Sequence, residues 1–421
     1  MNIAETVGYL QLAAKRGARL GLSRVRELVH RLGDPQNAVK VIHISGTNGK
    51  GSVGAMLASV LNAAGIRTGH FATPAILQIN DYFRISGIPA SDRLIAEIMT
   101  RVRAEAEQMD DLPTEFEILA AAAYLMFASE RCEAAVIECC MGGDTDCTNV
   151  IDRPLLSVIT NVRADHCGFL GNTLAEIARH KAGIIKAGCP VLCGCRNPET
   201  VAVIRDYAKA VNAPLFLRQE SPSEIHATLQ GTDFRSIFPC FGEMHLSLLG
   251  LYQPDNAALV LDAVRLLRRT GLNLPNEAVR AGLAACRWHG RFELLRDTPP
   301  VLFDGAHNPD GMGITAKSLA HYFGTERPLV FVLGVMADKE YQCYPALLRD
   351  LAYKVYTVQP DNPRALSADA LCRVFTEADI PAAACSSVRE ALRLALCESR
   401  PVMGLGSLYL YREFAEALSG L

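Results

Sequence analysis

Hydrophobic and polar positions recur along the chain with two different periods, which predicts strands that alternate with helices. Short apolar runs typical of buried strands occupy residues 41–44, 66–71, 134–137, 155–160 and 190–193. Apolar residues recur at helical spacing in residues 3–32, 52–64, 91–108, 114–129 and 173–185. This alternation favours a parallel sheet that helices cover on both faces.

The pattern changes twice in the second half of the chain. Residues 219–247 hold short polar and apolar alternations with turn residues, which indicate a small antiparallel addition. Helices are predicted at residues 254–270 and 275–286, and a new α/β series follows, with strands at residues 301–303, 329–333, 354–358 and 402–405. We therefore expect an α/β protein of two domains: residues 1–293 with a parallel sheet, and residues 294–421 with a Rossmann-like fold.

Composition narrows the possible classes of protein. The chain has 421 residues, a formal net charge of -3 and 21% charged residues, so it lacks the basic excess of a general nucleic-acid binder. The longest apolar run, Ile118–Phe127, is too short to cross a membrane, and the N-terminus has no charged leader before an apolar core. Among fourteen cysteines the close pairs are Cys139-Cys140 and Cys193-x-Cys195, without a second pair at zinc-ligand spacing. We expect reduced cysteines and a cytoplasmic location.

The most informative segment is His43–Ser52 (HISGTNGKGS), between a predicted strand and a predicted helix. Its glycines allow a tight turn whose N–H groups point at one anion, Lys50 adds a positive charge, and the following helix directs its positive dipole end to the same place. The G-x-x-x-x-G-K-[ST] pattern is not met literally, because Ile44 stands at its first glycine and Gly51 precedes Ser52. An ordinary glycine turn is the alternative, but the flanking strand and helix favour a P-loop-type phosphate site.

The same segment resembles the nucleotide loop of the folylpolyglutamate synthase and dihydrofolate synthase family, within the Mur ligase superfamily. The similarity extends along nearly the whole chain as ordered motifs: Thr114–Glu117 (T-x-F-E), Glu138–Asn149 (E-x-G-x-G-G-R-x-D-x-T-N), Thr160-Asn161, Asp165-His166, Leu170–Thr173, Lys181–Ile184 (K-A-G-I), Leu249–Asn256, Gly290–Glu293, Asp304–Pro309, Asp338-Lys339, Asn362–Arg364 and Gly406–Tyr409. So many motifs in one order argue against chance.

The chain departs from the family pattern at three places. T-S-P-H after the second strand becomes Ala72–Ala75, N-E-R-I becomes Asn80–Phe83, and the arginine of G-G-R becomes Asp144. These are positions where the family handles magnesium or the pterin substrate, whereas the nucleotide motifs are intact.

The resemblance implies an ATP-dependent, ADP-forming ligase that adds L-glutamate to a folate-type carboxylate, as folylpolyglutamate synthase, dihydrofolate synthase or both. The acceptor carboxylate takes the γ-phosphoryl group and becomes an acyl phosphate, which the amine of glutamate attacks. The resemblance further implies ATP as co-substrate, two Mg²⁺ ions, a pteroate or folate acceptor and a monomer, and from charge and hydropathy we expect no nucleic-acid or membrane partner. Residues 1–293 would be the ATP-binding domain.

The resemblance also assigns the candidate site residues. The ATP-binding positions are Thr47, Asn48, Gly49, Lys50, Gly51, Ser52, Asn256, Arg291 and Asp304; the metal positions are Thr73, Glu138 and His166; the acceptor positions are Phe116, Asp146 and Thr148. The catalytic candidates are Lys50, Lys181 and His166, with Lys181 carbamylated as in the family.

Some of these assignments compete with ordinary structural roles. Glu138 ends an apolar strand at the edge where parallel sheets hold ligands, and a carboxylate there suits Mg²⁺; a strand-end salt bridge is the alternative. Lys181 could instead be a solvated helix charge, and Phe116 a core side chain. His307 is either catalytic or a support for the turn at Asp304.

Two rival functions share these motifs. A Mur ligase acting on a cell-wall nucleotide precursor would have the same loop and metal residues, but the motifs at residues 114–117, 249–256 and 406–409 favour the folate branch. A non-catalytic nucleotide-binding module would not need to keep all the candidate catalytic and metal residues.

The departures also bear on the acceptor. Ala75 removes an imidazole, Tyr82 replaces an arginine, and Asp144 replaces a cation by an anion. A site with these changes should tolerate long, anionic glutamate tails poorly, so we expect a preference for short acceptors such as dihydropteroate or a monoglutamate folate. The alternative is that Asp144 pairs with a nearby lysine or arginine and faces away from the acceptor.

Overall fold

The computed structural model describes residues 1–164 and 167–421, which form two compact units. Unit 1 consists of Met1–Pro222, Ser236–Met244 and Asp255–Cys286, and unit 2 consists of Ser223–Arg235, His245–Pro254 and Arg287–Leu421. Each unit has its own β-sheet and its own hydrophobic core. The boundary expected between residues 293 and 294 stays a prediction.

An eight-stranded sheet forms the centre of unit 1, in the order β4-β3-β2-β5-β1-β6-β7-β8. Its strands are β1 (Lys40–Ser45), β2 (Thr68–Phe71), β3 (Phe83–Ile85), β4 (Ile88–Pro89), β5 (Ala134–Glu138), β6 (Leu156–Ile159), β7 (Val191–Cys193) and β8 (Leu215–Leu217). The strands from β2 to β8 in this order run parallel, which confirms the expected parallel sheet. The β3–β4 hairpin adds two antiparallel strands at one edge, which the apolar pattern did not predict.

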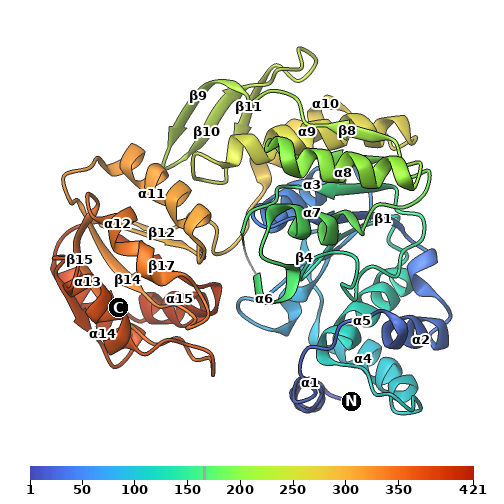
Figure 1. Cartoon of the computed structure of the whole chain (residues 1–421), viewed down its shortest axis with the longest axis horizontal. Coiled ribbons are helices and arrows are strands. Elements are labelled where there is room, and N and C mark those ends of the chain that lie inside the picture. The colour runs from blue at the N-terminus through green and yellow to red at the C-terminus, as the bar shows by residue number, and fades with distance from the viewer. Residues whose placement is uncertain (165–166) are drawn as a thin grey trace. The chain divides into compact units, whose positions relative to one another are not determined.

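Helices cover both faces of this sheet. They are α1 (Ile3–Ala14), α2 (Ser23–Arg31), α3 (Lys50–Ala63), α4 (Asp92–Ala106), α5 (Glu115–Ser129), α6 (Cys167–Leu170), α7 (Leu174–Ala182), α8 (Pro198–Ala210), α9 (Gln253–Arg269) and α10 (Asn276–Ala285). On one face, α5 packs with α1, α2 and α4 in a core that includes Val41, Phe71 and Ile137 (Figure 1). On the other face, α3 lies against Ile44 and Val136 and packs with α10.

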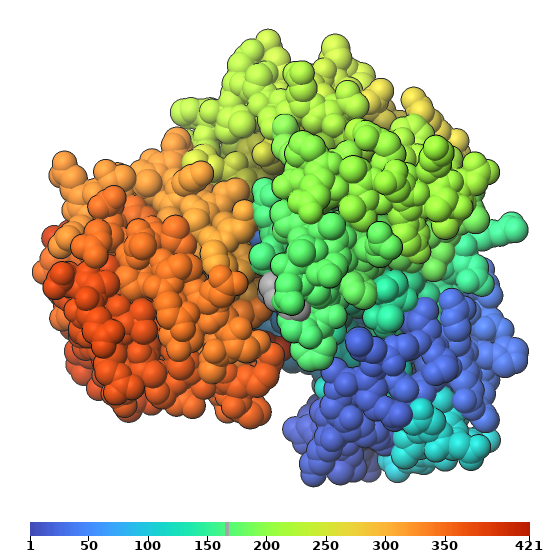
Figure 2. Space-filling model, viewed as in Figure 1, coloured from blue at the N-terminus to red at the C-terminus, as the bar shows by residue number. Residues whose placement is uncertain are grey.

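Helices α7 and α8 pack against each other and complete the cover of unit 1. Their apolar side chains, including Ile177 and Ile204, share a buried core with Ile159 of β6 and Val191 of β7. In the space-filling view the green segment that contains both helices lies on the visible side of this unit, beside the blue and cyan N-terminal segments (Figure 2).

Helix α5 shows how local signals and burial agree. Thr114 is its N-cap and forms a capping box with Glu117, which fixes where the helix begins. The residues Ile118–Phe127 that follow are all buried, so the longest apolar run is a core helix. Within the described part of the chain, no helix is long and apolar enough to cross a membrane.

Unit 2 is built on a six-stranded sheet in the order β12-β13-β17-β14-β15-β16. Its strands are β12 (Glu293–Asp297), β13 (Pro300–Asp304), β14 (Leu329–Leu333), β15 (Ala352–Thr357), β16 (Ala382–Ala384) and β17 (Val402–Leu405). Its helices are α11 (Pro309–Phe323), α12 (Tyr344–Leu348), α13 (Ala368–Thr376), α14 (Val388–Cys397) and α15 (Tyr411–Ser419). All strands except β12 run parallel, which confirms the expected Rossmann-like fold.

A separate three-stranded sheet, in the order β11-β10-β9, is the small antiparallel addition that the sequence predicts at residues 219–247. Its strands are β9 (Ser223–Thr228), β10 (Gly231–Arg235) and β11 (Glu243–Leu246). Strands β9 and β10 pair antiparallel.

Candidate active site

The phosphate loop joins β1 to α3, in the strand–turn–helix arrangement that the sequence predicts. Helix α3 begins at Lys50, so the first N–H groups of the helix, which have no acceptor within it, lie at the loop. Two further N–H groups of the loop are bound by Asn161, in the segment after β6. Thr47 N donates to Asn161 O (3.0 Å), and Asn48 N donates to Asn161 Oδ1 (2.9 Å). The Thr160 hydroxyl donates to Asn48 O (2.8 Å). Thr160 and Asn161 therefore fix the loop, a role that the sequence motif did not reveal.

The Lys50 side chain folds back over the loop. Its ammonium group donates to the carbonyl oxygens of Gly46 (3.0 Å) and Thr47 (3.3 Å). Both acceptors are neutral, and an ammonium group binds an anionic phosphate oxygen more strongly than a carbonyl oxygen. The side chain is thus placed to exchange loop carbonyls for phosphate.

Glycine is required at two positions of the loop. Gly46 has a φ of 150°, and a Cβ atom there would lie 1.9 Å from Thr160 Oγ1. Gly49 has a φ of 85°, and a Cβ atom there would lie 2.8 Å from Asn256 Oδ1. Asn256, one of the predicted ATP-binding residues, therefore lies directly against the phosphate loop.

Two of the three predicted metal ligands lie at the ends of neighbouring strands, next to the loop. Glu138 is the last residue of β5 and is in register with Ile44 of β1, while Thr73 follows the end of β2 on the other side of β5. Glu138 is only 2% exposed. In residues 1–164 and 167–421, no three His, Cys, Asp or Glu side chains converge as a metal-binding group. A carboxylate and a hydroxyl nevertheless fit Mg²⁺, which prefers hard oxygen ligands and keeps several waters. The third predicted ligand, His166, lies outside the described residues.

Lys181 lies in the last turn of α7 and is 3% exposed, which argues against a solvated helix charge. Burial raises the pKa of the Cys139 thiol well above its ordinary value, and the positive charges of Lys50 and Lys181 oppose that rise. Because Cys139 directly follows Glu138, both lysines act electrostatically at the end of β5.

Cys140 is a residue of this region that the sequence reading missed. It stands at the first glycine of the family pattern E-x-G-x-G-G, so the difference was visible in the motif itself. Its thiol lies beside Thr73 and within electrostatic range of Lys50 and Glu138. Burial raises the pKa of Cys140 to about 12, so the thiol stays protonated at neutral pH.

Asp146 and Thr148 belong to one buried hydrogen-bond network. The Asp146 carboxylate accepts from Thr148 Oγ1 (2.5 Å), Thr148 N (3.0 Å) and Met141 N (2.8 Å). Thr148 Oγ1 also lies 2.9 Å from Nε2 of His43. Burial lowers the pKa of His43 to about 3 and raises that of Asp146, so His43 is neutral. Thr148 is wholly buried and orients Asp146; contact of either residue with an acceptor stays a prediction.

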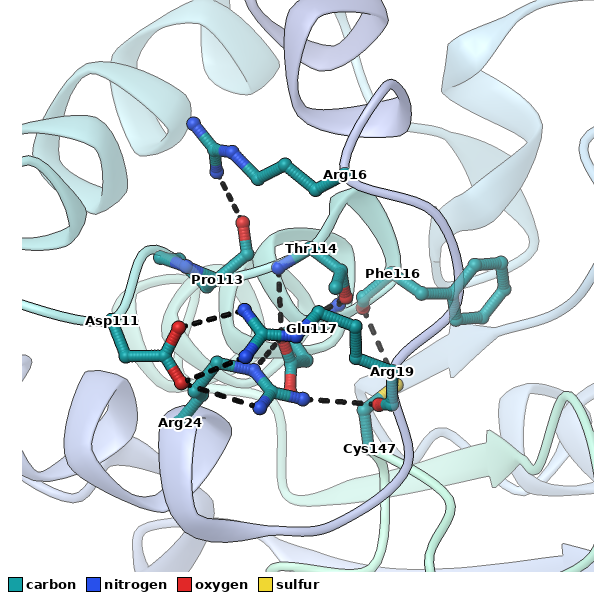
Figure 3. A network of polar contacts seen from close by, with 9 residues as sticks. All are labelled: Arg16, Arg19, Arg24, Asp111, Pro113, Thr114, Phe116, Glu117 and Cys147. Atoms are coloured by element: carbon teal, nitrogen blue, oxygen red, sulfur yellow. Dashed lines mark hydrogen bonds and ion pairs between the residues drawn. The ribbon is translucent and has the colours of Figure 1, made fainter.

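Phe116 lies in the first turn of α5, which a buried polar network holds in place (Figure 3). Glu117 Oε2 accepts from Thr114 N (2.7 Å), from Thr114 Oγ1 (3.0 Å) and from Arg24 Nε (3.1 Å). The Cys147 thiol donates to Phe116 O (3.4 Å), which links the Asp146 segment to α5. The Phe116 ring is only partly buried and points away from the network (Figure 3).

Asp144 pairs with a histidine, and the alternative of a lysine or arginine partner is wrong. Its carboxylate oxygens lie 2.9 and 3.0 Å from Nδ1 of His180, on α7. Asp144 N also donates to His180 O (2.9 Å). The two side chains are 38% and 36% exposed, so solvent weakens the pair.

Unit 2 holds the remaining predicted ATP-binding residues, Arg291 and Asp304. Asp304 ends β13, is buried, and accepts from Tyr252 Oη (2.9 Å), Phe292 N (2.7 Å) and Ala306 N (2.7 Å). Burial raises the pKa of Asp304, and the charge of Arg291 opposes the rise, so the two predicted residues act on each other. Tyr252 lies in the motif Leu249–Asn256, but its hydrogen bond to Asp304 could be found only from the structure.

His307 was predicted to be either catalytic or a support for the turn at Asp304, and the structure shows it supporting that turn. His307 Nδ1 is hydrogen-bonded to Gly305 O (2.9 Å), and Tyr344 Oη donates to His307 O (2.9 Å). The catalytic interpretation stays untested.

Comparison with known proteins identifies the family. Residues 44–264 match the Mur ligase middle domain, and residues 290–405 match the Mur ligase glutamate ligase domain. The chain is 35% identical, over 100% of its length and 99% of the relative's, to folylpolyglutamate synthase of Lacticaseibacillus casei. It is 36% identical, over 83% of its length and 84% of the relative's, to dihydrofolate synthase/folylpolyglutamate synthase of Bacillus subtilis (strain 168).

Solved structures agree with this assignment. The Mycobacterium tuberculosis folylpolyglutamate synthase complexed with ADP and AMPPCP superimposes with a TM-score of 0.89 and 30% identity, over 100% of this chain and 99% of that one. Escherichia coli FolC in complex with DHPP and ADP gives a TM-score of 0.88 and 27% identity, over 100% and 98% of the two chains. This chain therefore belongs to the folylpolyglutamate synthase and dihydrofolate synthase family of Mur ligases.

Proposed function

We propose that this chain is an ATP-dependent, ADP-forming ligase that joins L-glutamate to a carboxylate of a pteroate or folate. The observation that carries the proposal is a built phosphate loop beside Glu138, with the charges of Lys50 and buried Lys181 acting at the same end of β5. Its relatives are named for this synthase activity, and a solved relative is complexed with ADP and AMPPCP.

The phosphate loop would hold and neutralise the polyphosphate of ATP. The N–H groups at the start of α3 and the Lys50 ammonium group would face the phosphates, and Asn256 lies beside them. In unit 2, Arg291 would bind phosphate as a fork and Asp304 would meet the ribose side. Such fixed donors stabilise the charge that develops as the γ-phosphoryl group leaves ADP.

Thr73, Glu138 and His166 would hold Mg²⁺, and a carbamate on Lys181 would hold a second ion. When bound, Mg²⁺ supplies positive charge that neutralises the phosphate oxygens. The buried Glu138 carboxylate is held at the end of β5, next to the phosphate loop, so the chain presents an oxygen ligand where that charge is needed.

The acceptor would lie against Phe116 and the segment around Asp146. Its carboxylate oxygen attacks the γ-phosphorus, the bond to the ADP oxygen breaks, and an acyl phosphate forms. The amine of glutamate then attacks the acyl carbon, loses a proton and displaces phosphate. The Thr148 and Arg24 networks position Asp146 and the first turn of α5 that carries Phe116, so an acceptor bound there would meet fixed side chains.

An ADP-release assay across acceptors and amino acids tests the proposal. Sustained ADP release should occur only when ATP, Mg²⁺, L-glutamate and a pteroate or folate acceptor are all present. Release that depends on a cell-wall nucleotide precursor instead would support the other branch of the Mur ligases. Release without any acceptor would contradict ligase activity.

Glu138→Gln should raise the Mg²⁺ concentration for half-maximal rate by about tenfold, because the variant loses a carboxylate ligand but keeps its shape. Magnesium titrations of ADP release measure this change. Glu133→Gln, an exposed carboxylate just before β5, is the matched control and should behave as wild type. Titrations of Glu138→Gln that superimpose on wild type would make Glu138 a structural residue.

Asp144→Arg changes the local charge by two units, each worth about 1 kcal/mol at ~4 Å in water, so it should improve kcat/KM for long polyglutamate acceptors by roughly thirtyfold. Asp144→Asn removes one charge without reversing it, so it should give a smaller gain of about fivefold. The measurement is kcat/KM against acceptors of increasing glutamate number. A wild-type series that is flat or rising, and unchanged by Asp144→Arg, would exclude the charge argument.

A further inference from the structure

Departures from the family pattern that are distant in the sequence lie close together in unit 1. Ala72 N donates to Tyr82 O (3.3 Å), which continues the pairing of β2 with β3 and places the altered segments 72–75 and 80–83 side by side. Cys140, in place of a glycine, lies beside Thr73 of the same segment. Asp144 is the exception, because it pairs with His180 on α7.

Tyr82 connects this altered region to the predicted acceptor residue Phe116. Tyr82 ends the 3₁₀ helix η2 (Ile79–Tyr82), and its ring stacks on Phe71, with centroids 6.1 Å apart and an interplanar angle of 25°. The Phe116 ring meets Tyr82 edge to face, at 6.3 Å and 88°. Phe71 is fully buried, whereas Tyr82 and Phe116 are only partly buried. Two partly exposed rings from different elements therefore meet at a right angle.

We propose that Tyr82 is a specificity-determining residue which, together with Phe116, forms an aromatic corner for the ring system of the acceptor. The proposal rests on the function proposed above. A flat aromatic ligand can stack on the face of one ring and meet the edge of the other, and aromatic pairs prefer these two arrangements. The family's N-E-R-I pattern places an arginine at this position, whose charge would attract a carboxylate. Tyr82 lacks that charge and offers an aromatic ring instead.

The acceptor class that follows is a molecule recognised by its aryl or pteridine ring more than by its glutamate tail. The edge-to-face geometry favours contact with a planar ring over an extended aliphatic chain, because a planar ring can stack on the face of one aromatic side chain and meet the edge of the other. The fully buried Phe71 beneath Tyr82 keeps the corner in place, since a packed ring resists displacement.

Four variants test this proposal: Tyr82→Phe, Tyr82→Leu, Tyr82→Arg and the control Tyr207→Leu. Tyr207 is a partly buried tyrosine of α8 that packs on the α7–α8 core. The measurements are KM for pteroate, for a tetraglutamate folate and for ATP, together with the Kd of pteroate by calorimetry. Tyr82→Leu should raise the KM and Kd of pteroate by about tenfold and leave the KM of ATP unchanged, whereas Tyr82→Phe should match wild type. Tyr82→Arg should raise the KM for pteroate and lower the KM for the tetraglutamate folate.

The outcomes separate this proposal from the function on which it rests. Wild-type protein that forms no ADP with any acceptor would overturn the proposed function. An active wild type whose pteroate Kd does not change in Tyr82→Leu would overturn the role of Tyr82 alone. A lower kcat with unchanged KM and Kd, or the same loss in Tyr207→Leu, would show a general packing effect and would also overturn it.

Discussion

Lys50→Ala is expected to lower kcat/KM by at least roughly a hundredfold, or ~3 kcal/mol, while the protein stays folded. The variant removes a cation that sits at the phosphate loop and contacts only loop carbonyl oxygens among its described hydrogen bonds. ADP-release kinetics give the loss of activity, and thermal unfolding followed by circular dichroism shows whether the fold is kept.

Lys40→Ala is the matched control for this experiment. Lys40 is an exposed lysine at the first residue of β1, so the same charge is lost from the same strand at the end away from the loop. It should keep wild-type kinetics. A folded Lys50→Ala protein that retains most of its activity would remove the loop lysine from the mechanism.

The architecture of unit 1 was predictable to the extent that its strands are continuous apolar runs. Strands β1, β2, β5, β6 and β7 are buried along nearly their whole length, and each was expected from the sequence. Strands β3, β4 and β8 have two or three residues and include exposed or partly exposed positions. They are therefore too short to show a hydrophobic pattern in the sequence. Only their hydrogen bonds to neighbouring strands define them.

In the candidate site, too, features set by neighbouring residues were predictable, whereas contacts between residues distant in the sequence were not. The loop at Lys50 and the strand end at Glu138 are set by neighbouring residues, so the sequence places both correctly beside one sheet edge. The hydrogen bonds that the loop donates to Asn161 join residues more than a hundred positions apart. Asp144 and His180 are 36 positions apart, and the alternative of a lysine or arginine partner was wrong because α7 brings a histidine there. Such partners depend on tertiary packing and leave no local signal.

Lys181 is expected to carry a carbamate in the active protein, and Lys181→Ala is expected to lose activity by roughly a hundredfold. The side chain is 3% exposed, and burying an ammonium group is costly, so a modification that lets the group bind a metal ion is favoured. The neutral amine attacks carbon dioxide, an N–C bond forms and a proton is released, which turns a cation into an anionic oxygen ligand. The family resemblance at Lys181–Ile184 agrees with this chemistry.

Labelled bicarbonate makes the carbamate visible by carbon NMR, and its removal should lower activity in step with the signal. Lys186 is the informative control, because burial lowers the pKa of its amine and makes it the chemical rival for carbon dioxide. The signal should disappear in Lys181→Ala and persist in Lys186→Ala. If the signal disappears only in Lys186→Ala, the modification is assigned to the wrong lysine. If Mg²⁺ supports full activity of a protein with an unmodified Lys181, the amine itself is the active form and no carbamate is needed.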